Sequence, residues 1–103
     1  MVYFPTVSTR GTVFLFEFWG CGSRAMRDGQ EMATLLRRVS RKLGTEVVHS
    51  AYRRFDTGGI GGFSTFYDGH VAVRTFPEHG YAMVDLYLCG EGVDIDVISV
   101  FLK

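Results

Sequence analysis

The sequence contains few of the residues that mark several large classes of protein. Only two cysteines, Cys21 and Cys89, occur in 103 residues, which excludes a disulfide scaffold and makes a reducing cytoplasm the expected location. The three histidines show no short ligand spacing and no Cys-x-x-Cys pair occurs, so no metal is expected. No apolar run is long enough to cross a bilayer and no signal peptide opens the chain, so no membrane partner is expected.

Net charge is also missing. Lys plus Arg and Asp plus Glu number 11 each, and no basic run occurs, which argues against nucleic acid as a partner. What is present is apolar: 47% of the residues are hydrophobic and 15% are aromatic, so the chain can bury a core and a disordered chain is excluded. The length predicts a single domain over residues 1–103, with a loose lead-in over residues 1–10.

Alternating apolar and polar residues predict an antiparallel sheet of four or five strands. The glycine-rich segment 56–62 is expected to be a flexible turn and not a phosphate loop, because it lies between strands and not before a helix. Segment 93–103 fits either a strand or a helix capped by Asp94. The predicted strands cover residues 12–18, 45–55, 62–67, 70–76 and 81–89.

The clearest single element is a helix that begins after Asp28. Asp28 is the expected N-cap, with Glu31 at the capping-box position, and Gly44 is the expected C-terminal glycine. The sheet and helix together predict an α+β two-layer sandwich, with one or two helices on one face. Such a sheet leaves a face or its edges open, which favours a homo-oligomer, most simply a dimer. Helical spacing predicts one apolar face made of Met32, Leu35, Leu36, Val39 and Leu43.

Asp68-Gly69 joins two alternating runs and is a strong signal for a tight β-hairpin. His70, Arg74 and Phe76 share one face of the strand that follows. If the neighbouring strand faces coincide with it, they form an aromatic pocket that carries His, Arg, Asp and Cys. Otherwise they are the polar side of a solvent-facing sheet. The other two faces hold His49, Arg53 and Phe55, and Asp85, Tyr87 and Cys89.

The run HVAVRTFPEHGYAMVDLYLCG, residues 70–90, resembles the short bacterial and archaeal S-adenosylmethionine (AdoMet) decarboxylases of polyamine synthesis. In that family a Glu-Ser-His turn leads into a strand, followed by Thr-Trp-Pro-Glu, an aromatic residue with Gly-Tyr, an Asp and a closing Cys-Gly. Residues 75–90 keep that order and spacing, with His79 in place of the aromatic residue. The resemblance covers about residues 12–95 and implies AdoMet or a related nucleoside as the ligand.

The resemblance also implies that one reaction has been lost. Family members cut their own chain before a serine and convert that serine to a pyruvoyl group, which acts as the electron sink. Gly69 matches this serine and has no hydroxyl. Gly61 matches a second processing serine, and Arg74 matches the processing histidine. Self-cleavage and a pyruvoyl group are therefore not expected, and no other cofactor is implied.

The substrate site of the family has matching residues in this chain. Phe55 and Phe76 match the residues that flank the adenine, and Glu78 matches the carboxylate that holds the ribose hydroxyls. Cys89 matches the proton donor, although a lone cysteine is more often a small buried apolar residue. The resemblance thus implies substrate binding by Phe55, Phe76, Glu78 and Tyr81, and catalytic roles for His70, Arg74 and Cys89.

Two functions fit this pattern. In the first, the protein cleaves AdoMet without a pyruvoyl group. The substrate's own carboxylate attacks Cγ and releases methylthioadenosine and homoserine lactone, with Arg74 or His70 orienting the carboxylate. In the second, the protein is a non-catalytic AdoMet or nucleoside sensor, or a regulatory partner of an active decarboxylase. Two weaker alternatives are a hydrolytic triad of Ser64, His70 and Asp85, and self-cleavage at Ser64, which lies within a predicted strand.

Overall fold

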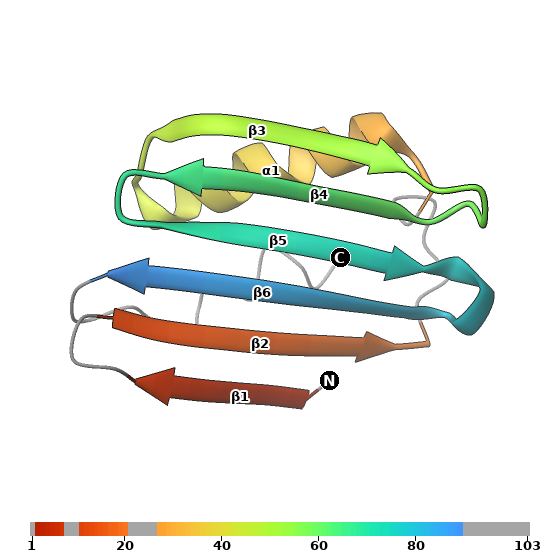
Figure 1. Ribbon diagram of the computed structural model, residues 1–103, viewed down its shortest axis with the longest axis horizontal. Helices are drawn as coiled ribbons and strands as arrows, with labels where there is room; N and C mark the ends of the chain where they lie inside the picture. Colours follow the sequence, from red (N-terminus) through yellow and green to blue (C-terminus); the bar gives the residue numbers. More distant parts are fainter. Residues whose placement is uncertain (1, 8–10, 21–26, 90–103) are drawn as a thin grey trace.

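A computed structural model of the chain describes residues 2–7, 11–20 and 27–89. The described strands form one antiparallel sheet in the order β1-β2-β6-β5-β4-β3, and α1 lies against β3 and β4 (Figure 1). The predicted α+β sandwich with a helix on one face is confirmed. The elements are β1 (Val2–Val7), β2 (Gly11–Trp19), α1 (Gly29–Leu43), β3 (Val47–Arg54), β4 (Ile60–Phe66), β5 (Gly69–Phe76), the short 3-10 helix η2 (Pro77–His79) and β6 (Tyr81–Cys89).

The predicted loose lead-in is wrong for residues 2–7, which form β1 and pair with β2 along its whole length. Valine, tyrosine, phenylalanine and threonine favour a strand, and an edge position tolerates Pro5. The described part of the sheet therefore has six strands, and not four or five. The strand and helix alternatives for segment 93–103 fall outside the described residues.

The helix α1 has the predicted caps at both ends. The Asp28 carboxylate accepts a hydrogen bond from the Gln30 amide at 2.8 Å. Gly44 adopts a left-handed conformation with φ 68°, and its amide donates to the Arg41 carbonyl at 3.1 Å. The helix buries Met32, Leu36 and Val39 against the sheet and exposes the basic side chains of Arg37, Arg41 and Lys42.

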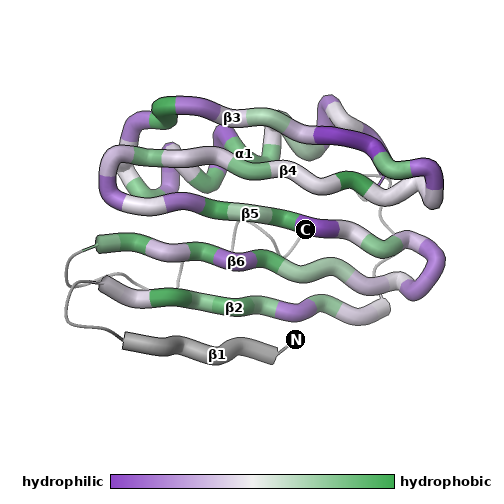
Figure 2. The backbone as a smooth tube through the Cα atoms, viewed as in Figure 1, coloured by the Kyte–Doolittle hydropathy of each residue, from purple (hydrophilic) through white to green (hydrophobic). Residues whose placement is uncertain are grey.

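The sheet has one buried face and one open face. Figure 2 shows hydrophobic and hydrophilic residues alternating along β5 and β6, as a strand with one buried side requires. We use the term open face for the side of the sheet turned away from α1. The buried face carries the sheet's share of the core, namely Phe14, Phe16, Ile60, Phe66, Val71, Val73, Val84, Leu86 and Leu88.

The glycine-rich turn is shorter than expected. The strand β4 begins at Ile60, so the last three residues of the predicted turn lie inside the sheet. Gly61 pairs with Arg74 and Gly62 pairs with Val73 of β5. The turn itself is closed by a hydrogen bond from the Phe55 amide to the Gly59 carbonyl at 2.8 Å. This turn carries Phe55 from the end of β3 to the open face.

Candidate ligand-binding site

The strand faces singled out in the sequence coincide on the open face. The register places Arg74 between Gly61 of β4 and Met83 of β6, and His70 in line with Tyr87. The third set of residues, on β3, lies on the same face because Arg53 pairs with Gly61. The candidate residues form two groups, one toward each end of β5.

The first group surrounds Arg74 and is aromatic. The guanidinium carbon of Arg74 lies 3.9 Å from the ring centroid of Phe55 and 4.8 Å from that of Phe76. We call these three residues the aromatic clamp. The aromatic contacts continue from Phe76 to Tyr81 at 5.7 Å and from Tyr81 to Trp19 at 5.6 Å, measured between ring centroids. These distances are typical of cation–π and tilted aromatic contacts.

The second group lies about 13 Å further along β5, since His70 comes four residues before Arg74. The Nε2 atom of His70 is 3.8 Å from Oδ1 of Asp85, and the two side chains are 43% and 47% exposed. The Tyr87 hydroxyl is 3.4 Å from the sulfur of Cys89. Cys89 is an exposed free thiol, so the alternative expectation that it is a small buried apolar residue is wrong. The polar group is open to solvent and is not an enclosed pocket.

Tyr81 connects the aromatic clamp to Glu17 of β2. Loss of hydration raises the pKa of the Tyr81 phenol, and the Glu17 carboxylate raises it further through its charge and by accepting a hydrogen bond from the phenol. The phenol is therefore a neutral hydrogen-bond donor at neutral pH. Glu78, the expected ribose ligand, is exposed on η2, which follows Phe76 directly.

Glu17 and Trp19 were not predicted as members of this site. The signal for them is the alternation of the strand near residues 12–18, which places both on the face opposite the buried phenylalanines. The sequence does not show which strand pairs with that strand in the sheet. In the structure β2 pairs with β6, with Trp19 opposite Tyr81, and this pairing brings the two residues to the clamp.

The predicted tight hairpin between β4 and β5 is confirmed, but its two turn residues are Tyr67 and Asp68, and Gly69 is the first residue of β5, opposite Phe66. The Thr45 hydroxyl donates to Oδ1 of Asp68 at 3.0 Å, and the Cys89 amide donates to the Asp68 carbonyl at 2.6 Å. A Cβ atom on Gly69 would collide with the backbone carbonyl of Tyr87. No side chain fits at position 69 unless this part of β6 shifts.

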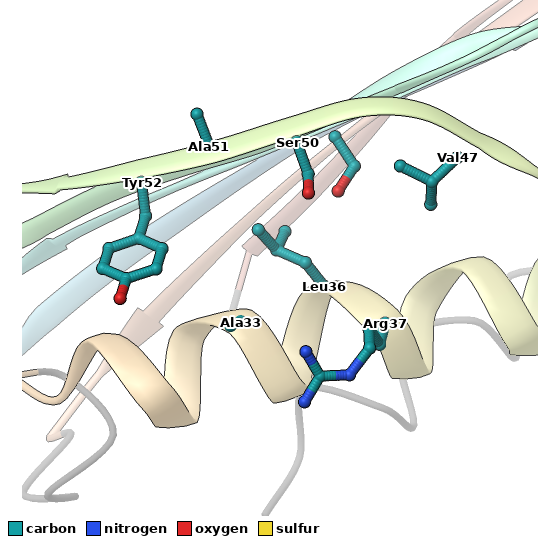
Figure 3. Close-up of a pocket in the computed structure, with 8 residues that line it drawn as sticks. Ala33, Leu36, Arg37, Val47, Ser50, Ala51 and Tyr52 are labelled. Carbon is teal, nitrogen blue, oxygen red and sulfur yellow. The ribbon is translucent and has the colours of Figure 1, made fainter.

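Ser64 lies on the other side of the sheet from His70 and Asp85, so the triad of these three residues is not assembled. Its side chain lines a cavity of about 390 Å³ between α1 and β3, beside Ser50 and Leu36 (Figure 3). The cavity lies on the helix-covered side of the sheet, and none of the predicted substrate-binding or catalytic residues lines it.

The part of the chain that the structure describes lacks two other kinds of feature. There, no three His, Cys, Asp or Glu side chains lie close enough together to share a metal ion. Among the same residues, no helix has the length and apolar character needed to span a membrane. The predicted site residues gather on the open face through the register of β4, β5 and β6.

The chain is similar to known proteins over most of its length. The family model for S-adenosylmethionine decarboxylase matches residues 12–103. S-adenosylmethionine decarboxylase proenzyme 2 of Halalkalibacterium halodurans is 32% identical over 96 residues, which cover 93% of this chain and 76% of the relative. The proenzyme of Shouchella clausii is 29% identical over 96 residues, covering 93% and 74%. The crystal structure of the adenosylmethionine decarboxylase from Aquifex aeolicus matches with a TM-score of 0.75 and 26% identity, covering 91% of this chain and 75% of that one.

Proposed function

Because the chain belongs to the S-adenosylmethionine decarboxylase family, we propose that it binds AdoMet on the open face and does so without cutting its own chain. Phe55 and Phe76 receive the adenine, Tyr81 lies against Phe76, and Glu78 of η2 holds the ribose hydroxyls. Aromatic faces suit both parts of this ligand, because a planar base stacks on them and a sulfonium cation is attracted to them.

The observation that carries the proposal of an uncut chain is the backbone around Gly69. Self-processing starts from a hydroxyl, which glycine lacks. The Tyr87 carbonyl occupies the space that a side chain would need, and the Asp68 carbonyl is held by the Cys89 amide at 2.6 Å. The other two matching positions, Gly61 and Arg74, also lack the groups that family processing uses. Each of these features supports a chain that stays whole and carries no pyruvoyl group.

The reaction we propose needs no electron sink. A carboxylate oxygen of AdoMet attacks its own Cγ, the bond from Cγ to the sulfonium breaks, and the sulfur keeps the electron pair. The products are methylthioadenosine and homoserine lactone, and the single positive charge lost at sulfur balances the negative charge lost at the carboxylate. The protein has to fold the substrate so that the carboxylate lies near Cγ, and to exclude competing water.

His70 and Arg74 are the two basic side chains that are candidates for orienting the carboxylate. His70 lies in the polar group, 3.8 Å from Asp85, and half of its side chain is open to a ligand. Arg74 lies in the aromatic clamp. The lactone step neither takes up nor releases a proton. The predicted role of Cys89 as a proton donor is therefore a role that decarboxylation would use, and the lactone route does not call on it.

To exclude water from the substrate, the open face must be covered. Large apolar side chains are exposed there: Trp19 is 55% exposed, Phe63 39% and Phe55 38%. We propose that a second copy of the chain covers this face as a homodimer, which removes these side chains from water.

A second candidate function is binding without turnover, as an AdoMet sensor or as a regulatory partner of an active decarboxylase. The observation that favours it is the position of Arg74. A guanidinium that pairs with the carboxylate of AdoMet lowers the nucleophilicity of that carboxylate, which slows lactone formation but strengthens binding.

The test is to incubate the purified full chain with AdoMet and to analyse the products by mass spectrometry. We expect methylthioadenosine and homoserine lactone with no carbon dioxide, and one chain of 11.6 kDa before and after incubation. Phe76→Ala should weaken AdoMet binding about tenfold, because it removes an aromatic face worth about 1 kcal/mol or more. Tyr67→Ala is the matched control, since Tyr67 is 83% exposed in the turn between β4 and β5.

Three results would count against parts of the proposal. Release of carbon dioxide together with two chain fragments would overturn the account of Gly69. Binding without any product would replace the lyase by the sensor. An affinity for AdoMet that is undetectable, or that is the same in Phe76→Ala and in the wild type, would remove the open face as the AdoMet site.

A further inference from the structure

We propose that Arg74 is the resident occupant of the aromatic clamp and selects the nucleosides that the protein binds. A ligand that stacks its base on Phe55 or Phe76 has to displace the guanidinium, and only a ligand with a carboxylate offers the displaced guanidinium a new partner. The inference rests on the proposed function for the position of the base. The inference goes beyond the proposed function in two respects. It identifies Arg74 as a gate, meaning a side chain that blocks the rings until it is displaced, and it identifies a carboxylate as the group that opens this gate.

The surroundings of Arg74 support this role. Its guanidinium carbon lies over both rings, at 3.9 Å and 4.8 Å from their centroids. Its Nε atom is buried and has no hydrogen-bond partner among the residues that the structure describes. No carboxylate of the described residues forms an ion pair with Arg74, whereas His70 has Asp85 nearby. The positive charge of Arg74 is thus balanced by ring faces, which is weaker than an ion pair and reversible.

The clamp depends on the glycine beside it. Gly61 is the register partner of Arg74, and a Cβ atom there would lie 3.2 Å from Cε2 of Phe55 and 3.6 Å from Cδ of Arg74. Contacts near 3.2 Å are tighter than side chains normally accept, so a larger residue at position 61 would push Phe55 away from the guanidinium. The absence of a side chain at Gly61 therefore leaves room for Phe55 to lie against the Arg74 guanidinium.

The gate separates a carboxylate-bearing ligand from a neutral nucleoside. While the guanidinium lies over the two rings, no base can stack on the ring surfaces that it covers. Displacement gives up two cation–π contacts and leaves a cation without a partner. The carboxylate of AdoMet can take up the guanidinium through charge-assisted hydrogen bonds, whereas methylthioadenosine has no such group.

The same gate accounts for product release. When the carboxylate becomes a lactone it loses its negative charge, and the guanidinium loses its partner. Arg74 then returns to Phe55 and Phe76 and competes with methylthioadenosine for the ring faces. One carboxylate oxygen paired with the guanidinium still leaves the other oxygen free to attack, so the gate is compatible with the proposed reaction and with a sensor.

Isothermal titration with two matched probes tests the gate. S-adenosylhomocysteine carries the carboxylate and methylthioadenosine lacks it, and neither is a sulfonium. The wild type should bind S-adenosylhomocysteine more tightly. Arg74→Ala should bind methylthioadenosine at least about fivefold more tightly than the wild type, since the two cation–π contacts that need no longer be broken are together worth at least about 1 kcal/mol. Gly61→Ala should act in the same direction while keeping the charge.

Arg53→Ala is the control for charge. Arg53 lies on the same face opposite Gly61, is exposed and takes no part in the clamp, so its removal should leave the ratio of the two affinities unchanged. A ligand-free measurement accompanies the titration. The Nε proton of Arg74 should show a ring-current shift in its NMR resonance, and AdoMet should abolish that shift.

The results separate failure of the gate from failure of the proposed function. AdoMet binding that leaves the Arg74 resonance unchanged overturns the gate and keeps the AdoMet site. Equal affinity ratios in the wild type and in Arg74→Ala do the same. No AdoMet binding by either protein overturns the gate and the AdoMet site together. AdoMet binding by Arg74→Ala alone overturns the gate and keeps the AdoMet site, because the carboxylate would then fail to displace the guanidinium.

Discussion

At the scale of single residues, two buried hydroxyls on the helix-facing side of the sheet have opposite surroundings. The Thr75 hydroxyl oxygen accepts a hydrogen bond from the Ile60 amide at 2.8 Å and lies 3.4 Å from the Ile60 carbonyl. The Ser64 hydroxyl is buried and has no hydrogen-bond partner in the described part of the chain. A buried polar group without a partner costs stability, and a partnered one contributes to it. The two side chains should therefore respond oppositely to removal of their oxygen.

We expect Thr75→Val to lower the free energy of unfolding by about 1–2 kcal/mol, because the replacement keeps the shape but leaves the Ile60 amide unpaired. Ser64→Ala should raise it by up to about 1 kcal/mol, since it removes only the unpaired hydroxyl. Urea denaturation followed by circular dichroism gives both values. If Ser64→Ala is as destabilising as Thr75→Val, the hydroxyl has a partner, and water in the adjoining cavity is the first candidate.

The residues of the open face show what a sequence can predict about a site. Strand alternation was enough to group His70, Arg74 and Phe76, because successive side chains of a strand point to opposite faces. Strand alternation could not predict the contact between Arg74 and Phe55. Phe55 lies after the end of β3, and its position depends on the turn closed between Phe55 and Gly59. That geometry is set by three-dimensional packing and not by periodicity.

At the scale of elements, local signals and remote pairing differ in the same way. The helix α1 was predicted with its caps, because Asp28 and Gly44 act on the nearest turns of the backbone. The strand β1 was missed. Its evidence is the pairing of residues 2–7 with residues 12–17 of β2, and Pro5 considered alone argues against a strand. An edge strand is stabilised by its neighbour, which a scan of local composition does not see.

The hairpin of β4 and β5 allows a prediction about the start of β5, where Gly69 stands. Restoring the family's serine through Gly69→Ser should not restore self-cleavage, because the Tyr87 carbonyl occupies the space that the side chain needs. We expect an intact chain by mass spectrometry and a loss of about 1–3 kcal/mol in unfolding free energy from overpacking. Ala72→Ser is the matched control, since it places a serine in the same strand with its side chain on the open face. Two fragments from Gly69→Ser would show that β6 yields and that the processing machinery survives.

At the scale of the whole molecule, the two sides of the sheet are unequal. One side is covered in part by α1 and carries the core, while the other exposes Trp19, Phe55 and Phe63 beside polar groups. An apolar area of this kind on a small domain is typical of a surface that binds another protein. The proposed homodimer gives it an occupant and also closes the AdoMet site to water.

Phe63 is the residue whose substitution tests the dimer most directly. It lies on the open face opposite Ala72 and packs at 5.8 Å from the His49 ring, away from the clamp. Light scattering after gel filtration should give the wild type twice the chain mass of 11.6 kDa. Phe63→Glu should give a single chain mass, because a carboxylate buried without a partner at the interface costs several kcal/mol. Tyr67→Glu adds the same charge in the turn beyond β4 and should remain dimeric. A wild type that stays monomeric at high concentration, or a Phe63→Glu protein that stays dimeric, would mean that the open face meets its ligand uncovered. The lactone route would then lack its barrier to water, and the sensor would become the better account of the protein.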